Sequence, residues 1–385
     1  MNPEIIGTDL MIPDTPCCTK NIPENIGQSD QQYSRILSGS VIDTLKLATR
    51  IIRSDPRLLV TMGRIVSFQK KASTKRHLNE LSGLQVPAVI MFSLTHRCNL
   101  NCRGCYMHAQ NRQTSPDLTL DQIRSLVRQS VDLGVSFFVL AGGEPLVRVD
   151  EILILAHEYP DMIFAVYTNG TLITPDIADA ISAYKNLVLI ISIEGNQKET
   201  DARRSNGVFG SIIQSFSLLK NLGVFFGCSV TLTQNNYATV TDDSFISRML
   251  NYGCRIITYV EYVPVQQDTE DLVLTVLQRE ELVRLIACFS DRYPALFFGF
   301  PGDEIRFGGF LSAGRGFVHI SSSGDLEPCP AAPFSDANVT CMPLSDALKS
   351  GFLAKIRANH GMLSEADGGC ALWKNRDWTL SLLGK

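Results

Sequence analysis

Short apolar runs alternate with amphipathic segments through the middle of the chain. Six runs rich in Val, Ile and Phe are separated by stretches in which apolar residues recur at helical spacing. The runs lie at residues 89–95, 137–143, 163–169, 187–194, 225–233 and 256–265. Strands buried on both faces have nearly continuous apolar runs, and alternation with helices favours parallel pairing. The pattern predicts an α/β fold in which six units wind into a partial (β/α)6 barrel.

The two ends of the chain differ from this middle part. Residues 1 to about 30 are rich in Pro, Asn, Asp and Gly without any period, which predicts a mobile tail. Residues 34–81 have helical spacing and carry ten Lys or Arg against three acidic residues. Such a basic helix can contact an anionic membrane or an acidic partner. We favour the more common role, a solvated face on a helix that packs against its own domain.

These differences predict three parts. A tail with a helical extension occupies residues 1–85, a barrel core residues 86–295, and a small appended domain residues 296–385.

Composition and charge narrow the functional classes. The net charge of −4 and the pI of about 5.9 give no reason to expect a nucleic-acid partner. No apolar run approaches the roughly 18 residues of a membrane-spanning helix, and the amino terminus lacks the pattern of a signal peptide. Peripheral contact with a membrane stays open. The eleven cysteines are therefore expected as thiols or metal ligands in the cytoplasm rather than as disulfides.

Three cysteines directly follow the first predicted strand. Cys98, Cys102 and Cys105 have the spacing C-x3-C-x2-C, so one loop can place thiolates at three corners of an iron–sulfur cube. Three ligands leave one iron open, as a reactive metal site requires. The alternative is a structural Cys3His zinc site completed by His96 or His108.

Candidate binding residues stand at the ends of the later strands. Active sites of parallel sheets and barrels lie at the carboxyl ends of the strands. The candidates there are Gly142, Gly143, Glu144, Pro145, Asn169, Ser192, Glu194, Thr231 and Val260.

Together, the cysteine triplet, the AGGEP segment and the SIEG segment resemble the radical S-adenosylmethionine (SAM) superfamily. The resemblance implies a TIM-like barrel with a [4Fe–4S] cluster on Cys98, Cys102 and Cys105. It also implies that the candidates at the strand ends bind SAM, and that reductive cleavage of SAM yields a 5′-deoxyadenosyl radical. One position departs from the family, because the aromatic residue usual before the third cysteine is Gly104 here, and Tyr106 follows instead.

The carboxyl-terminal region resembles the SPASM/twitch subgroup through the segment GDLEPC, which ends at Cys329. The resemblance implies an auxiliary iron–sulfur cluster on Cys329, Cys341 and Cys370. The subgroup usually has a further cysteine near position 310, where this chain has Phe310. The simpler interpretation is a set of buried thiols in a small domain.

These observations predict a radical SAM oxidoreductase or maturase that modifies a substrate still to be identified. A peptide or protein substrate is favoured, and a tetrapyrrole or lipid precursor comes next. The expected electron donor is a flavodoxin or a ferredoxin. Two alternatives remain: an iron–sulfur electron carrier or sensor without radical chemistry, and a zinc-stabilised binding protein.

Overall fold

The computed structural model describes residue 49 and residues 59–110, 116–300, 312–363 and 370–384. One nine-stranded sheet, in the order β7-β6-β5-β4-β3-β2-β1-β8-β9, forms its centre. All neighbouring strands are parallel except the last pair, β8 and β9. The strands are β1 (Val89–Thr95), β2 (Phe137–Gly142), β3 (Ile163–Thr168), β4 (Leu187–Ser192), β5 (Phe226–Leu232), β6 (Ile256–Glu261), β7 (Leu296–Phe300), β8 (Phe317–Ile320) and β9 (Leu326–Glu327).

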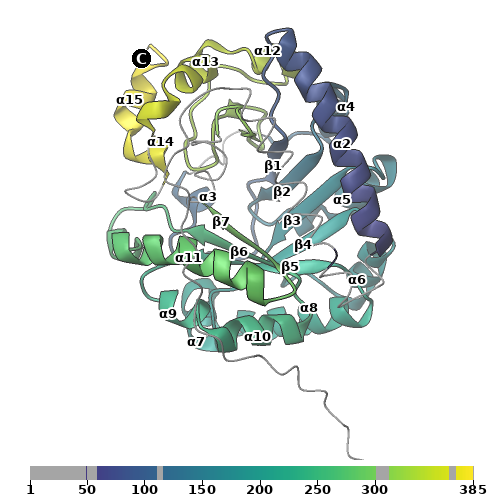
Figure 1. Cartoon of the computed structure of the whole chain (residues 1–385), viewed down its shortest axis with the longest axis vertical. Helices are drawn as coiled ribbons and strands as arrows, with labels where there is room; N and C mark the ends of the chain where they lie inside the picture. Colours follow the sequence, from purple (N-terminus) through teal and green to yellow (C-terminus); the bar gives the residue numbers. More distant parts are fainter. Residues whose placement is uncertain (1–48, 50–58, 111–115, 301–311, 364–369, 385) are drawn as a thin grey trace, which may run out of the picture.

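Helices follow the strands and lie outside the sheet (Figure 1). The helices of the barrel part are α2 (Leu59–Leu81), α3 (Tyr106–Ala109), α4 (Leu120–Leu133), α5 (Val149–Glu158), α6 (Pro175–Ser182), α7 (Gln197–Arg204), α8 (Val208–Asn221), α9 (Tyr237–Val240), α10 (Asp243–Tyr252) and α11 (Val276–Arg292), with 3-10 turns η2 (Pro145–Arg148) and η3 (Glu270–Leu272). The carboxyl-terminal helices are α12 (Leu344–Ala347), α13 (Gly351–Ala358), α14 (Ala371–Lys374) and α15 (Arg376–Ser381), with the 3-10 turn η5 (His360–Met362).

Helix α4 illustrates why these segments are helical. Thr119 and Gln122 form a reciprocal capping box at its start, and Gly134 ends it in the left-handed conformation, with φ of 100°. Between these signals, Ile123 and Leu126 recur at helical spacing and are buried against the sheet.

Apolar side chains are buried on both faces of the sheet. On β1, Ile90 and Phe92 belong to the large cluster between sheet and helices. A second cluster includes Ala165 on β3, Val188 on β4 and Ile256 on β6. Burial on both faces explains why these strands are continuous apolar runs rather than alternating ones.

The six strands expected from the sequence are confirmed, and the sheet extends beyond them. Strand β7 pairs in parallel with β6, although its residues were assigned to the appended domain. Strand β8 pairs in parallel with β1 on the other side. Strand β7 was not predicted from the sequence because LFFGF is a short run. In the structure it packs under α11, where the ring of Phe297 contacts that of Phe289. No break in the sheet therefore marks residue 296, and the division into three parts stays a proposal.

Helix α2 accounts for part of the basic segment, whose first half lies outside the described residues. It lies across α4 (Figure 1), with Lys75, Arg76 and Asn79 donating to backbone carbonyls at the end of that helix. The distance from Arg76 Nη1 to the carbonyl oxygen of Gly134 is 2.7 Å. Burial lowers the pKa of Arg76 to about 10. Basic groups stabilise a helix at its carboxyl end, so these contacts fit the expected structural role of the segment.

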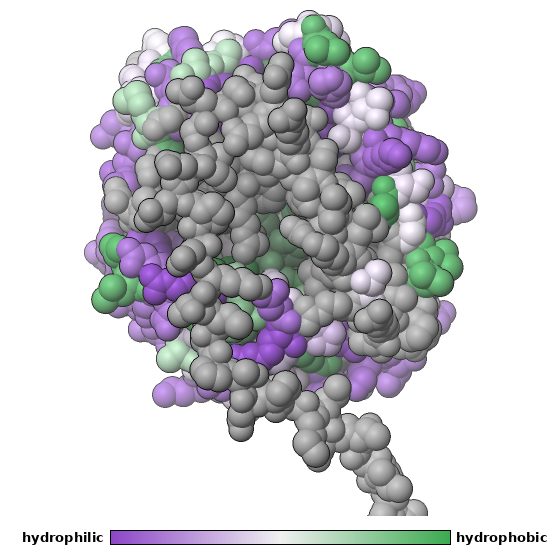
Figure 2. Space-filling model, viewed as in Figure 1, coloured by the Kyte–Doolittle hydropathy of each residue, from purple (hydrophilic) through white to green (hydrophobic). Residues whose placement is uncertain are grey.

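The visible surface of the described residues is mainly hydrophilic. Hydrophilic residues dominate the coloured rim of the molecule in Figure 2, with hydrophobic residues scattered among them. Over the described ranges, no helix combines the length and the apolar character needed to cross a membrane.

Candidate functional site

The cysteine triplet occupies the loop that leaves β1. Cys98, Cys102 and Cys105 are half-buried thiols outside any disulfide. Cys105 is the residue before α3, and its carbonyl accepts from the backbone N–H of Ala109 at 3.0 Å. The backbone N–H of Cys105 in turn donates to the carbonyl of Cys102 at 3.3 Å. The loop that carries the three thiols thus begins at the carboxyl end of β1.

Burial and neighbouring charges shift the pKa of two of the three thiols. Burial raises the pKa of both Cys98 and Cys102, and the neighbouring cysteines raise them further. At Cys102 the positive charges of Arg204 and Arg203 act in the opposite direction. Without a positive charge nearby, Cys98 and Cys102 therefore favour the protonated thiol, and a bound metal would supply the charge that their thiolates need.

The zinc alternative finds little support in this arrangement. Within the described ranges, no three His, Cys, Asp or Glu side chains are grouped so as to hold one metal ion. His96 Nδ1 is 3.1 Å from Asp117 Oδ1, and His108 Nε2 is 3.1 Å from the carbonyl of Leu100. A zinc ion needs four ligands at about 2.0–2.3 Å from one point, whereas a cube spreads its ligands over different irons.

The glycines of the AGGEP segment let the end of β2 approach the cysteine loop. The backbone N–H of Gly143 donates to the carbonyl of Thr95 at 2.7 Å, and that of Glu144 to the carbonyl of Arg97 at 2.8 Å. A Cβ on Gly142 would lie 2.4 Å from the Thr95 oxygen, and one on Gly143 would lie 2.1 Å from the Arg97 oxygen. Only residues without a side chain permit this approach.

Glu144 joins two strand ends. It is buried, and its carboxylate accepts from the backbone N–H groups of Leu146 and Asn169 and from the Thr168 hydroxyl, at 3.0, 2.8 and 2.6 Å. Burial raises the pKa of Glu144 despite these bonds. Pro145 continues the segment as the first residue of η2. Within the chain, then, Glu144 holds the ends of β2 and β3 together.

Asn169 links β3 to the cysteine loop. Its side-chain amide donates to Asn99 Oδ1 at 2.8 Å, while its own oxygen accepts from the backbone N–H of Thr171 at 2.9 Å. Asn99 lies between the first two cysteines of the triplet. The predicted candidate therefore positions the loop.

Glu194 anchors a charged network beside the triplet. Its Oε1 accepts from Arg203 at 2.6 Å and from Arg204 at 2.7 Å, and its Oε2 accepts from the backbone N–H of Thr231 at 3.2 Å. Burial alone would raise the pKa of Glu194, but the charges and hydrogen bonds of the two arginines outweigh it and lower the pKa. The network fixes two cations where they act on Cys102.

The two arginines were not predicted from the sequence. They stand at the end of α7, nine and ten residues beyond Glu194, the last candidate at that strand end. The backbone carbonyl of Arg203 also accepts from Arg103, within the cysteine loop, at 3.0 Å. The signal available was the adjacent pair in DARRS after SIEG.

The remaining candidates share the same edge of the sheet. Ser192 ends β4 and is paired with Ser229. Thr231 on β5 is paired with Val260 on β6, and both are half-buried. Tyr106 is the first residue of α3, directly after the triplet.

Acid titration tests the Glu194 network. The pKa of Glu194 is lower in the folded than in the unfolded chain, so its stabilising contribution is present above the unfolded pKa and is lost as pH falls through the folded pKa. We expect Glu194→Gln to lower the free energy of unfolding by about 3 kcal/mol at pH 7, because it leaves the buried Arg204 and the half-buried Arg203 without their anion. In urea unfolding at successively lower pH, the difference from wild type should shrink.

A matched substitution controls for loss of a carboxylate. Glu158→Gln breaks the ion pair with Arg124, whose side chains are 34% and 36% exposed. Such a pair is worth about 0–1 kcal/mol. Equal losses in the two variants would contradict the role assigned to Glu194.

Two of the three carboxyl-terminal cysteines come together. Cys329 Sγ and Cys370 Sγ are 3.9 Å apart. Cys341 is exposed, and its Sγ lies 3.6 Å from the Thr340 hydroxyl. The expected three-cysteine set is thus represented in the structure by one close pair.

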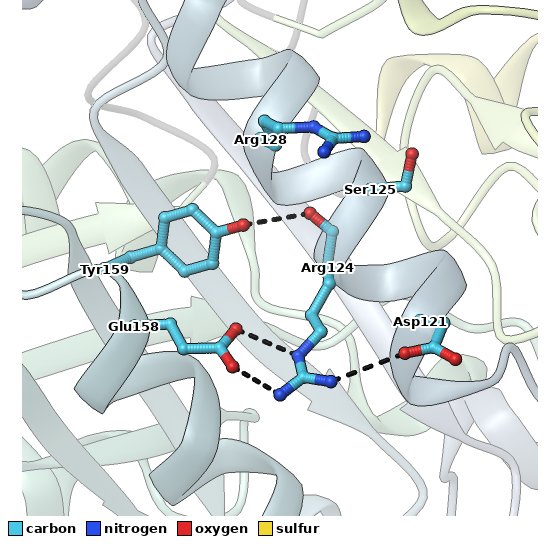
Figure 3. Close-up of a pocket in the computed structure, with 6 residues that line it drawn as sticks. All are labelled: Asp121, Arg124, Ser125, Arg128, Glu158 and Tyr159. Atoms are coloured by element: carbon cyan, nitrogen blue, oxygen red, sulfur yellow. Dashed lines mark hydrogen bonds and ion pairs between the residues drawn. The ribbon is translucent and has the colours of Figure 1, made fainter.

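A separate surface pocket lies in the helical layer, between α4 and α5 (Figure 3). Figure 3 shows Arg124 bonded to both Glu158 and Asp121, with the Tyr159 hydroxyl donating to the Arg124 carbonyl at 3.2 Å. These groups are engaged with one another, and the pocket is apart from the cysteine loop. We assign the functional site to the strand ends.

Comparison with known proteins matches the middle of the chain to one family. The family model described as the radical SAM superfamily matches residues 92–245, which include the cysteine triplet, the glycine segment and Glu194. Residues 92–245 of this chain therefore match a radical SAM domain. Proteins of this family bind a [4Fe–4S] cluster and SAM.

The relatives that match this chain have different named activities. The AdoMet-dependent heme synthase of Methanosarcina barkeri is 25% identical over 287 residues, which are 68% of this chain and 81% of the relative. The mycofactocin maturase MftC of Mycolicibacterium smegmatis is 28% identical over 262 residues, 65% of this chain and 66% of the maturase. Streptococcus suis SuiB, solved with its precursor peptide SuiA, matches with a TM-score of 0.59 at 18% identity over 79% of this chain and 74% of SuiB, and so supports the fold.

The residues present suit these cofactors. The triplet offers three sulfur donors, the preferred ligands of iron–sulfur clusters. The glycines allow close backbone approach, and the buried Nε of Arg203 has no hydrogen-bond partner within the described part of the chain. A cationic, sulfur-rich edge of this kind fits an iron–sulfur cluster and the carboxylate of SAM.

Proposed function

We propose that Cys98, Cys102 and Cys105 hold the [4Fe–4S] cluster and leave one iron for SAM. The observation that carries the proposal is the half-buried triplet on a loop that is anchored from three sides, at Gly143, Asn169 and Arg203. When bound, the cluster and SAM supply the electron and the deoxyadenosyl group for hydrogen abstraction.

The side chains of this protein would then bind and orient the cluster and SAM. Arg203 and Arg204 add positive charge beside the thiolates and can attract an anionic carboxylate. Glu194 keeps both guanidinium groups in place, so we assign it a positioning role.

The remaining strand-end candidates are proposed as the wall along SAM. Gly142 and Gly143 bring backbone close to the cysteine loop. The others in this proposal are Glu144, Pro145, Asn169, Ser192, Thr231, Val260 and Tyr106.

A second redox site is proposed at the carboxyl-terminal cysteines. Cys329 and Cys370 are close enough to bind one auxiliary iron–sulfur cluster together with other ligands. The exposed Cys341 is proposed as a further ligand. An auxiliary cluster would accept the second electron of a net oxidation. The electron donor is proposed to be a flavodoxin or a ferredoxin.

The proposed substrate is a peptide or protein. The maturase relative and the GDLEPC segment ending at Cys329 support this class. The heme synthase relative, which this chain covers over 81% of its length, makes a tetrapyrrole the second candidate.

Isotope transfer separates the two substrate classes. The reduced, reconstituted enzyme is incubated with SAM and a fully deuterated low-mass extract of its host cells, and 5′-deoxyadenosine is analysed by mass spectrometry. Hydrogen abstraction from a peptide predicts deuterium in 5′-deoxyadenosine that disappears when the extract is first digested with a broad protease. Deuterium that survives digestion and follows the tetrapyrrole fraction would overturn the peptide assignment.

A further inference from the structure

Three buried polar side chains connect β1 with the carboxyl-terminal hairpin. His319 on β8 lies between Ser93 on β1 and Glu327 on β9. Its Nε2 is 2.8 Å from Ser93 Oγ, and its Nδ1 is 2.8 Å from Glu327 Oε2. Ser93, His319 and Glu327 are 2%, 1% and 2% exposed.

Their donors and acceptors are matched. Each nitrogen of the His319 ring has a hydrogen-bonding partner, because Nδ1 faces the Glu327 carboxyl group and Nε2 faces the Ser93 hydroxyl. A buried polar group left without its partner is costly, which makes this chain of contacts specific to one arrangement of the three strands.

The hairpin is also held by buried apolar side chains and by backbone contacts. Val318, Ile320 and Leu326 are at most 1% exposed, and the carbonyl of Ser322 accepts from the backbone N–H of Leu118 at 2.7 Å. β8 has four residues and β9 has two, and a two-stranded hairpin of this size is marginal by itself. In the sheet, His319 is paired with Met91 across β1 and with Glu327 across β9. The side-chain contacts therefore add to a short backbone ladder at the point where the hairpin meets the barrel.

The Ser93–His319–Glu327 contacts connect the segments that carry the two cysteine sites. Ser93 precedes Cys98 by five residues on the same segment, and Glu327 precedes Cys329 by two. A second contact joins the two segments farther along, where the amide of Gln110 donates to the carbonyl of Pro330 at 2.7 Å. The Cys329 segment is thus tied both to the strand that enters the cysteine loop and to the helix that leaves it.

We propose that Ser93, His319 and Glu327 form a clamp that positions the Cys329–Cys370 pair relative to the cysteine triplet. The proposal rests on the proposed function in giving both sites a redox role. The three residues are positioning residues, and the distance between the two sites depends on them.

Cysteine alkylation tests the clamp on the reconstituted full-length protein under anaerobic conditions. The probe is iodoacetamide, and mass spectrometry follows each cysteine with time. Loss of one buried hydrogen bond raises the population of the open hairpin about tenfold, so His319→Phe and Glu327→Gln should each raise the alkylation rates of Cys329 and Cys370 about tenfold. Cys228 and Cys254, which are 0% exposed in the barrel core, report global unfolding and should stay protected.

Two further variants separate positioning from general stability. His319→Gln, which keeps hydrogen-bonding capacity, should restore much of the protection. Ser93→Ala in the His319→Phe background should add nothing, because residues that act through one contact are not additive. Wild-type rates in both His319→Phe and Glu327→Gln would overturn the proposal, as would alkylation of Cys228 and Cys254 in step with Cys370.

The result is independent of the proposed function. An enzyme that fails to cleave SAM but shows the alkylation pattern keeps the clamp and loses the function. An enzyme that cleaves SAM with unchanged alkylation keeps the function and loses the clamp.

Discussion

Cys102→Ala is expected to abolish reductive cleavage of SAM. Cys102 is the proposed middle ligand of the triplet and the thiol on which the charges of Arg203 and Arg204 act. A cluster with two protein ligands left in this loop is not retained in a reactive position, so we expect the rate of 5′-deoxyadenosine release to fall at least about 10³-fold, to the background of the assay. The measurement is chromatography of the products formed by anaerobically reconstituted protein with dithionite and SAM.

Cys288→Ala is the matched control for this experiment. Cys288 is a half-buried cysteine on α11, whose Sγ lies 4.0 Å from Arg292. This variant removes the same thiol group outside the proposed site and should release 5′-deoxyadenosine at close to the wild-type rate. Sustained release by Cys102→Ala, with iron bound as in wild type, would contradict the ligand assignment.

Gly143→Ala is expected to have the second largest effect. The new Cβ would lie 2.1 Å from the carbonyl oxygen of Arg97, a backbone atom that cannot move without displacing the cysteine loop. Overpacking of this kind costs about 1–3 kcal/mol, and a displacement of roughly 1 Å at a reacting centre can cost about 10²-fold in rate. We expect lower thermal stability and about 10²-fold slower release of 5′-deoxyadenosine.

Gly210→Ala provides the same chemical change in open space. Nothing lies within 4 Å of the Cβ position of Gly210, which is inside helix α8. Alanine is the better helix former by about 0.5–1 kcal/mol, so this variant should be slightly more stable and equally active. If Gly143→Ala behaves like Gly210→Ala, the close approach of β2 to the cysteine loop is not needed for function.

The sequence was sufficient where one local pattern determines the structure. The six apolar runs predicted strands β1 to β6 because burial on both faces leaves no alternation to misread. The spacing of Cys98, Cys102 and Cys105 predicted a loop of three thiols after the first strand, and the structure has the half-buried thiols there. Their metal-binding role stays a prediction. The glycine segment was predicted as a point of close approach, and Gly142 and Gly143 lie against the loop backbone.

Local sequence patterns could not predict contacts between segments that are far apart in the chain. Arg203 and Arg204 belong to a helix, and only the fold brings them to Cys102. Likewise, His319 is one residue in a short strand of the carboxyl-terminal region, and its contact with Ser93 spans 226 positions. Glu144 was predicted to contact a cofactor, but within the chain it joins β2 to β3 through three hydrogen bonds. Its role depends on neighbours that local patterns do not specify.

The carboxyl-terminal cysteines show the same limit. The resemblance to the SPASM/twitch subgroup placed Cys329, Cys341 and Cys370 in one candidate ligand set. In the structure the first and last are neighbours, whereas Cys341 faces Thr340. Which thiols meet depends on how the hairpin and α14 pack, and the positioning clamp on His319 is one of the contacts that we expect to decide it.

The central claim is that the triplet holds a cluster with an iron open to SAM. Electron paramagnetic resonance of the dithionite-reduced Cys329→Ala/Cys370→Ala protein, recorded with and without SAM, tests it most directly, because that double variant leaves the triplet as the remaining proposed cluster site. The account predicts a reduced [4Fe–4S] signal whose g-values shift when SAM is added. Absence of a cluster signal, or a signal that SAM leaves unchanged, would contradict it.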